Sequence, residues 1–447
     1  MGIKIWERFT KADNIFQSLR PLTYISIIGL APFHLKSQNE VRTSALSFVA
    51  GIAHFLFFVL CFFMSRRENG SIIGYFFQTN ITKLGDATLS LTGVIAMFTI
   101  FGFAIFKRDR LIGIIQNNLV VDEIFVRLGM KLNYRKIYWY SFAMSFGMLL
   151  FNFIYLCVSY MLLRSAEITP SFVVFTTFAL PHINISIMVF KFMCTTHLAK
   201  SRFHMLNEIL QDILDSHIED SHAVELSPLH SVVRINRSVP RRRPTTISMA
   251  SNQQQPQRYS VASIIRQNPE LALRQVTNIH NLLCDICNTI EEYFTYPLLA
   301  IIAISFLFIL FDDFYILEVK LNPNCVEGFE ADEFFAFFIT QMFWYVIIIV
   351  LIVEGSSRTI KESGKCAAIV HKILNITDDG DIRDRLLRLS LQLQHRRVRF
   401  TAAELFNLDR TLIFTMTGAA TCYLIILVQF RTTHHTDPNA NATNCAS

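Results

Sequence analysis

Seven long apolar stretches are the feature of this 447-residue chain that most constrains its fold. A helix needs about 20 apolar residues to cross a bilayer, because each backbone polar group must find its partner inside the segment. The stretches that meet this requirement are 45–64, 87–106, 137–163, 171–195, 296–311 with a helical extension, 334–353 and 411–430. The sequence therefore predicts an all-α, polytopic membrane protein with seven transmembrane helices.

The distribution of Lys and Arg predicts the orientation, because cytoplasmic segments are enriched in these residues. With the N-terminus inside, the inner segments hold 34 of the 41 Lys and Arg residues, and Lys191 falls within the fourth span. We therefore expect a cytoplasmic N-terminus and an extracellular C-terminus. The outer segments are acidic, which indicates either a rim that concentrates cations near a pore mouth or ordinary solvated loop charges. Their acids are Glu68, Asp86, Glu167, Asp312, Asp313, Glu318, Glu327, Glu330, Asp332, Glu333 and Asp437.

The spans divide the chain into alternating membrane and cytoplasmic parts. Residues 228–266 contain seven Arg and no Lys, Asp or Glu, with too little apolar surface to fold, so we expect a disordered basic linker that does not bind nucleic-acid polymers. The expected parts are a cytoplasmic N-terminal segment (1–44), spans one to four (45–195), cytoplasmic helices around the linker (196–295), spans five and six (296–353), a cytoplasmic helical anchor region (354–410), the seventh span (411–430) and an extracellular tail (431–447).

Neither catalytic nor metal-binding motifs are present. The chain has no paired His motif, phosphate loop or Ser elbow, and Cys284 and Cys287 form a lone C-x-x-C that is better explained by packed helix cysteines. We therefore expect no enzyme activity, no cofactor and no metal. The sequons at Asn80 and Asn441 are predicted to be glycosylated, and the outer cysteines Cys325 and Cys445 are the two that can form a disulfide.

Polar groups within the spans are few. His54 and His182 are the deepest titratable side chains, and a neutral packing role is favoured over a ligand contact. On the seventh span a helical stripe fits a narrow, hydrated constriction, or else a helix packed inside the bundle with Thr hydroxyls bonded one turn back. Spacing leaves both interpretations open. The stripe consists of Thr411, Thr415, Gly418, Cys422, Ile425 and Gln429.

The end of this span resembles a family signature. Cys422 and Tyr423 are followed by five apolar residues and then by Gln429 and Phe430. This ending is similar to that of the insect gustatory receptors, which have a Thr-Tyr pair at the first two positions. Nearly the whole chain outside 228–266 also resembles branch 28 of that family. The matching stretches are 20–24, 74–82, 191–194, 279–287, 312–315 and 355–358.

The resemblance implies a tetrameric, ligand-gated, non-selective cation channel in the plasma membrane of sensory neurons. Four copies of the seventh helix, in a homo- or heterotetramer, would surround one pore. Gln429 and Phe430 would form its gate and Tyr423 would support the helix, while Cys422 and Ile425 would lie at or beside the pore. Cys422 replaces the signature Thr and bonds more weakly than a hydroxyl.

A separate pocket in the outer half of spans two to six would bind the tastant, for example a bitter compound or a ribonucleoside. We expect polar and aromatic groups of spans three, four and six to line it, although each also suits ordinary core packing. These residues are Asn152, Tyr155, Phe175, Gln341, Trp344 and Tyr345. Two other functions stay open: a G-protein-coupled receptor, which would have its N-terminus outside, and an accessory subunit of a heteromeric taste receptor.

Overall fold

The computed structural model describes residues 14–25, 33–37, 40–43, 45–68, 80–165, 167–231, 268–321 and 331–434. Helices make up almost all of this part of the chain. They are α2 (Ile15–Ser18), α3 (Arg20–Ile25), α4 (Ala45–Arg67), α6 (Asn80–Phe106), α7 (Arg108–Arg127), α8 (Tyr134–Ser165), α9 (Phe172–Ser231), α11 (Pro269–Leu321), α12 (Ala331–Ile376), α13 (Gly380–His395) and α14 (Arg410–His434). Two short antiparallel pairs accompany them, β1 (Phe33–Ser37) with β2 (Glu40–Thr43) and β3 (Thr401–Ala402) with β4 (Phe406–Asn407).

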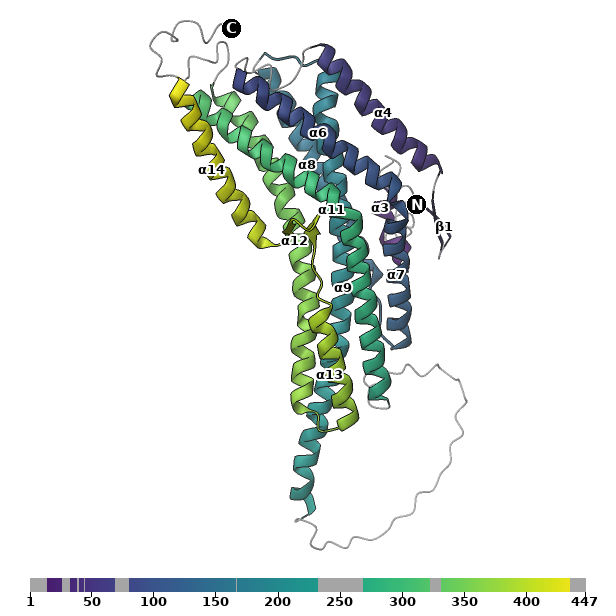
Figure 1. The fold of residues 1–447 in the computed structure, drawn as a ribbon. Coiled ribbons are helices and arrows are strands. Elements are labelled where there is room, and N and C mark those ends of the chain that lie inside the picture. The colour runs from purple at the N-terminus through teal and green to yellow at the C-terminus, as the bar shows by residue number, and fades with distance from the viewer. Residues whose placement is uncertain are drawn as a thin grey trace.

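Seven of the described helices are long and apolar enough to cross a membrane: α4, α6, α8, α9, α11, α12 and α14. This result confirms the prediction of an all-α protein with seven spans. In Figure 1, α4, α6 and α14 lie in the upper half of the bundle, whereas α7 and α13 lie in the lower half. The helices α9, α11 and α12 run through both halves, and we keep the terms upper and lower half below.

The three longest helices extend far beyond a bilayer. At 1.5 Å per residue, the 60 residues of α9 span about 90 Å, three times the hydrocarbon thickness. Apolar side chains continue at helical spacing along its lower part, and Phe203, Leu206, Ile209, Leu210 and Ile213 are all buried there. The lower half is therefore a packed helical bundle in its own right.

Helix α7 was not anticipated from the sequence, and a buried ion pair holds it in place. The Nε and Nη2 atoms of Arg202 on α9 donate to the two carboxylate oxygens of Asp122 on α7 at 2.6 and 2.7 Å. Both side chains are almost fully buried, with 1% and 2% of their surface exposed. The Tyr134 hydroxyl of α8 donates to the same carboxylate at 3.0 Å. Burial raises the pKa of Asp122, whereas Arg202 and Tyr134 oppose that rise.

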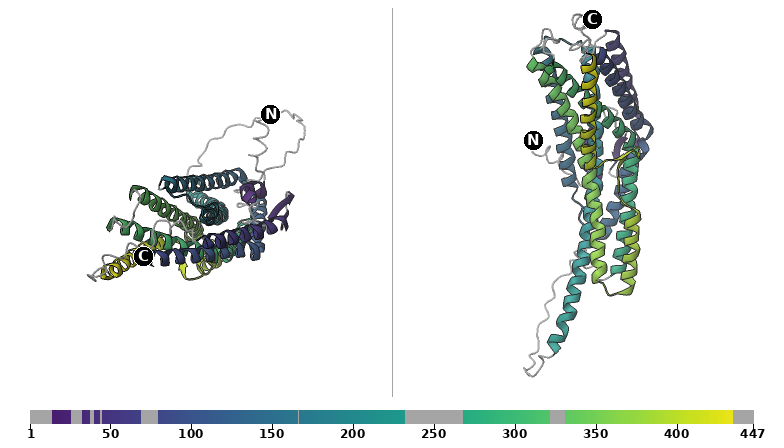
Figure 2. Two further views of the ribbon diagram at one scale, coloured as in Figure 1. Left: turned by 90° about the horizontal axis from the view of Figure 1, so that it is seen from above. Right: turned by 60° about the vertical axis from the view of Figure 1, so that its left-hand side comes forward.

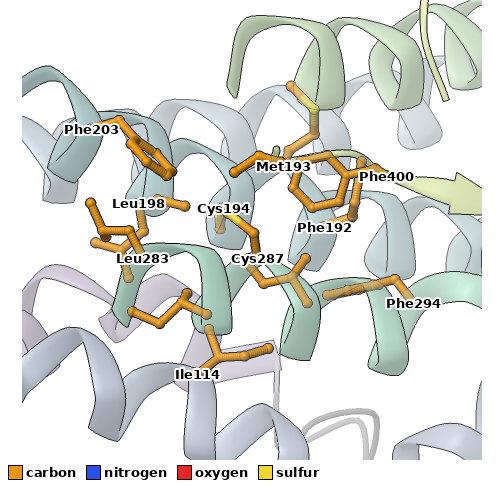
Figure 3. Packing of buried hydrophobic residues seen from close by; sticks show 14 of the residues in the cluster. Ile114, Phe192, Met193, Cys194, Leu198, Phe203, Leu283, Cys287, Phe294 and Phe400 are labelled. Carbon is orange, nitrogen blue, oxygen red and sulfur yellow. The ribbon is translucent and has the colours of Figure 1, made fainter. Parts of the chain in front are cut away.

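The apolar core joins the two halves along α9 and α11. Figure 3 shows Cys194 of α9 and Cys287 of α11 among Phe, Leu and Met side chains. Cys284 and Cys287 are buried free thiols, and no group of three metal-ligating side chains occurs among the described residues. This geometry agrees with packed helix cysteines.

Several predictions fall on parts of the chain outside the described residues. These are most of the basic linker, both outer cysteines Cys325 and Cys445, the sequon at Asn441, and the side chains of Asn80 and Phe430. They stay predictions.

Candidate functional site

A cavity of about 120 Å³ lies in the upper half, between α4, α6, α9, α11 and α12. Its wall is mainly apolar and aromatic, including Phe58, Phe178 and Phe308, with a few polar groups from Ser90, Thr177, His182, Gln341 and Tyr345. Ligand sites combine these two features, although drug-sized ligands occupy pockets of roughly 300–1,000 Å³. In this conformation the cavity admits a small molecule or one part of a larger one.

His182 is the most highly connected polar group of the cavity wall. Its Nε2 lies 3.1 Å from the Tyr155 hydroxyl, and its Nδ1 lies 2.7 Å from the Phe178 carbonyl oxygen one turn earlier. The Nδ1 atom must donate to that carbonyl, so a neutral ring accepts the Tyr155 hydroxyl at Nε2. Trp344 packs edge-on against the imidazole, with ring centroids 4.6 Å apart. His182 is thus held by packing, as favoured from the sequence, and it also faces the cavity.

Two neighbouring groups of α12 are buried with an unused hydrogen-bonding atom. The Gln341 Oε1 and the Trp344 Nε1 have no partner within the part of the chain that the structure describes. Buried polar atoms in native proteins almost always have a partner, so such exceptions need an explanation. A ligand or an ordered water that enters the site would supply one.

An ion pair lies at the edge of the cavity. The Arg66 Nη1 at the end of α4 donates to the Asp86 Oδ2 at the start of α6 at 3.2 Å, and both residues line the cavity. Arg66 is also positioned over the Phe62 ring, 5.7 Å from its centroid. The pair is partly exposed, so it fixes the relative position of α4 and α6 more than it adds to stability.

Only two of the six residues proposed from the sequence for the pocket line the cavity. Gln341 and Tyr345 line the cavity. Tyr155 and Trp344 form the layer behind His182, and they contact each other with ring centroids 5.6 Å apart.

Asn152 and Phe175 do not line the cavity. The Asn152 Nδ2 donates to the Met148 carbonyl, and its Oδ1 accepts from the Ser186 hydroxyl at 3.1 Å, which links α8 to α9. Phe175 packs against Tyr160 and Phe178. No sequence pattern indicated the roles of Arg66 and Asp86, whereas Phe178 could have been found one helical turn before His182.

Asp312 requires a correction. The sequence places it among the acidic residues of the outer loops, but α11 continues past it to Leu321 and its side chain is fully buried, with 0% exposed. Three other acids of that set do have partners. Asp86 forms an ion pair with Arg66, Glu68 accepts a hydrogen bond from Ser171, and Glu333 accepts one from Ser165. The interpretation of Asp312 as a rim charge or a solvated loop charge is therefore wrong.

Helix α14 is the least covered of the seven spans. Only 6% of its apolar window is buried, against 22–50% for the other spans, and it lies at the edge of the bundle both in Figure 1 and in the view from above (Figure 2). Cys422, Ile425 and Gln429 are exposed, and a Cβ added at Gly418 would meet no atom within 4 Å. The stripe predicted from the sequence is therefore an open face of this chain.

Other contacts of α14 agree with the second interpretation of the stripe, a helix that packs against the bundle, although the stripe itself is exposed. The Thr415 hydroxyl donates to the Thr411 carbonyl at 2.7 Å, as expected for hydroxyls bonded one turn back. Tyr423 points to a different side and contacts Phe306 of α11, with ring centroids 6.3 Å apart. At the start of the helix, the Arg410 Nη2 donates to the Glu354 carboxylate of α12 at 3.1 Å.

Comparisons with known proteins agree with this architecture. The family model described as "7tm Chemosensory receptor" matches residues 19–434. The chain is 71% identical over 447 residues to the Drosophila melanogaster protein named as gustatory receptor 28a, with 99% of this chain and 98% of that protein covered. It is 33% identical to the protein named as gustatory receptor 28b of the same species, over 98% of this chain and 91% of the relative.

Solved structures of an insect olfactory receptor share the fold. The structure of OR5 from Machilis hrabei superposes with a TM-score of 0.58 at 10% identity, and covers 92% of this chain and 97% of the receptor. The same receptor in complex with eugenol gives a TM-score of 0.55 at 10% identity, with 94% and 100% covered. By its sequence over nearly its full length, and with the matching fold, this multi-pass membrane protein belongs to the 7tm chemosensory receptor family.

Proposed function

We propose that this protein is a gustatory receptor that acts as a ligand-gated, non-selective cation channel in the plasma membrane of sensory neurons. A small tastant, such as a bitter compound or a ribonucleoside, binds in the cavity between α4, α6, α9, α11 and α12. Four copies of α14, from a homo- or heterotetramer in the lipid bilayer, line the pore. The N-terminus is cytoplasmic, so the upper half lies toward the outside.

The observation that carries this proposal is the open stripe of α14. A span that packs inside its own bundle would be covered on several sides, yet Cys422, Ile425 and Gln429 are exposed. A helix with this stripe exposed and another side in contact with α11 and α12 is suited to line a shared pathway between subunits. The Gln429 amide then provides a polar group at the outer end of an apolar pore.

The cavity supports the chemosensory part of the proposal. It is lined by aromatic and aliphatic side chains, and it presents a few polar groups, of which His182 is held by Tyr155 and by the Phe178 carbonyl. Such a site selects ligands by shape and by a small number of hydrogen bonds. The relative for bitter taste, gustatory receptor 66a of Drosophila melanogaster, is 26% identical over 36% of this chain, which favours bitter compounds among the candidates.

The test is whole-cell current from cells that express this chain alone, with G-protein signalling blocked, during application of bitter compounds, ribonucleosides and sugars. We expect a ligand-evoked cation current that Gln429→Ala alters and that Gln275→Ala, at the lower end of α11, leaves unchanged. A response that disappears with the G-protein block would contradict the channel. Silence despite confirmed surface expression, followed by current on co-expression with another gustatory receptor, would identify an accessory subunit.

Cys422 offers a second test of the pore. A small, charged thiol reagent applied to open channels should reduce the current in the wild type and spare Cys422→Ser. Cys157 serves as a matched control, because Cys157→Ser removes a thiol on α8 and should keep the sensitivity. Unchanged current in the wild type, under conditions in which the reagent blocks Gln429→Cys, would remove Cys422 from the pore.

A further inference from the structure

The conspicuous group that the proposed mechanism leaves unused is Asp312, within the Asp-Asp-Phe-Tyr stretch of α11. Its side chain is fully buried, and neither carboxylate oxygen has a hydrogen-bond partner in the described part of the chain. A buried carboxylate is costly unless it is paired, and ionisable groups at membrane depth usually mark a functional site. Asp312 therefore calls for a partner that the described residues do not supply.

The pairing of α11 with α12 places Asp312 beside the wall of the cavity. The Phe308 ring stacks on Tyr345 with centroids 4.5 Å apart, and the Tyr315 ring contacts Phe338 with centroids 5.4 Å apart. On α11, Asp312 lies one turn after Phe308. Because the two helices are antiparallel, the residue of α12 at the same level lies one turn before Tyr345, and that residue is Gln341.

Gln341 adds a second unused acceptor at this level. Its Oε1 is buried without a partner among the described residues, and Gln341 lines the cavity. Tyr345, which stacks on Phe308 one turn from Asp312, is another lining residue, and Tyr155 behind it bonds to His182. Two oxygens of Asp312 and one of Gln341, here called the acceptor cluster, thus lie at the same level of the α11–α12 pair, and Gln341 lines the cavity whereas Asp312 does not. In the described part of the chain these three oxygens meet no N–H or O–H donor.

We propose that Asp312 is the counter-ion for a protonated amine, and that Gln341 accepts a second hydrogen bond from the same ammonium group. This inference rests on the proposed ligand cavity and assigns it a chemical class of ligand. An ammonium group brings the positive charge and up to three donors that the acceptor cluster lacks. Its hydrocarbon part packs against the rings of Phe178 and Phe308, which line the cavity.

The surroundings favour an organic cation over a metal ion. No group of three metal-ligating side chains exists among the described residues, and the turns of α11 and α12 around Asp312 contribute aromatic side chains, with Asp313 as the adjacent carboxylate. Calcium takes six to eight oxygen ligands, so one carboxylate and one amide do not form a site for it. The cavity volume of about 120 Å³ limits the ligand, or its bound part, to a small amine.

Matched pairs of small amines and alcohols test the proposal with the full-length protein in detergent. The probes are phenethylamine with 2-phenylethanol, cyclohexylmethylamine with cyclohexylmethanol, and hexylamine with hexanol, so each pair differs mainly in the charged group. The rise of the melting temperature with probe concentration gives an apparent Kd for each. We expect at least one amine to bind about tenfold or more tightly than its alcohol, because hydrogen bonds to charged groups are the strong ones.

Asp312→Asn should abolish this preference, and Asp313→Asn is the matched control. Asp313 carries the same charge on the next residue, but it lines a different cavity, against α14. The control should keep the preference. Asp312→Asn should also melt at a higher temperature than the wild type without ligand, because it removes an unpaired buried acid.

Each outcome decides the matter. If none of the amines binds the wild type better than its alcohol, or if Asp312→Asn keeps the preference, the proposal is overturned. If Asp312→Asn fails to fold, Gln341→Leu decides the proposal: it should weaken amine binding more than alcohol binding, and equal weakening of both would overturn the proposal. Amines and alcohols that bind equally well would keep the cavity as the ligand site while removing the counter-ion.

Discussion

Replacing Asp122 with Asn leaves the Arg202 guanidinium buried without its counter-ion. The wild-type pair is bidentate, at 2.6 and 2.7 Å, and both side chains are almost completely buried. Removing one member of such a pair costs about 3–5 kcal/mol, because the remaining charge stays desolvated. Arg does not lose its proton in proteins, so Asp122→Asn should bear this full cost at any ordinary pH.

Arg202→Met should be less harmful, and its effect should depend on pH. The remaining Asp122 can take up a proton, and burial already raises its pKa in the wild type, with Arg202 opposing the rise. Without Arg202, the folded-state pKa moves further above the unfolded value of about 3.9. The folded state then binds more protons than the unfolded state, so stability is fully present below the unfolded pKa and is lost as pH rises through the folded pKa.

The double variant Asp122→Asn with Arg202→Met removes both charges and keeps an acceptor for the Tyr134 hydroxyl. It should therefore be more stable than Asp122→Asn alone. The assay is thermal melting of the four proteins purified in detergent, over a series of pH values from about 4 to 8. We expect Arg202→Met to lose stability more steeply than the wild type as pH rises above the unfolded pKa of Asp122. Additive losses in the double variant would refute the reasoning.

Three further predictions follow from the packing, the cavity and the topology. Gly355→Ala should lower the free energy of unfolding by about 1–3 kcal/mol, because its Cβ would lie 2.6 Å from the Met193 sulfur of α9. Gly418→Ala should leave the stability of the single chain unchanged, because its Cβ would meet no atom. Equal melting temperatures of the two variants would contradict this contrast. Tyr155→Phe removes the 3.1 Å contact with His182 and should shift the half-maximal ligand concentration about two- to tenfold at unchanged surface expression; an unchanged dose response would exclude the network from binding. Asn441→Gln should remove one endoglycosidase-sensitive shift on a gel if the C-terminus is extracellular, and a wild type that carries no glycan there would count against that orientation.

The seven spans could be predicted from sequence because each one needs a long apolar window, which is a local property. Helix α7 was missed because charged and amide side chains interrupt its apolar residues throughout, and its position depends on Asp122 meeting Arg202, 80 residues away. No periodicity in one segment reveals such a partner.

The candidate site could be predicted only in part, for the same reason. Gln341 and Tyr345 were recognised as polar and aromatic groups on one span, but the contact of Arg66 with Asp86 depends on how α4 packs on α6. For Asp312, an error of one residue in the predicted end of a span was enough to give the wrong environment. The fifth span was predicted to end one residue before it, and this turned a buried acid into a loop residue, because the ends of an element are the least certain part of a prediction from sequence.

The continuity of α12 has a mechanical consequence. The helix contributes Gln341 and Tyr345 to the cavity wall, and Glu354, about two and a half turns after Tyr345, accepts a hydrogen bond from Arg410 at the start of α14. No interruption of the helix separates these points, so bending there is resisted by the whole hydrogen-bond ladder. If α12 tilts so that the cavity widens, Glu354 moves with it. The ion pair between Glu354 and Arg410 then transmits this displacement to the start of α14.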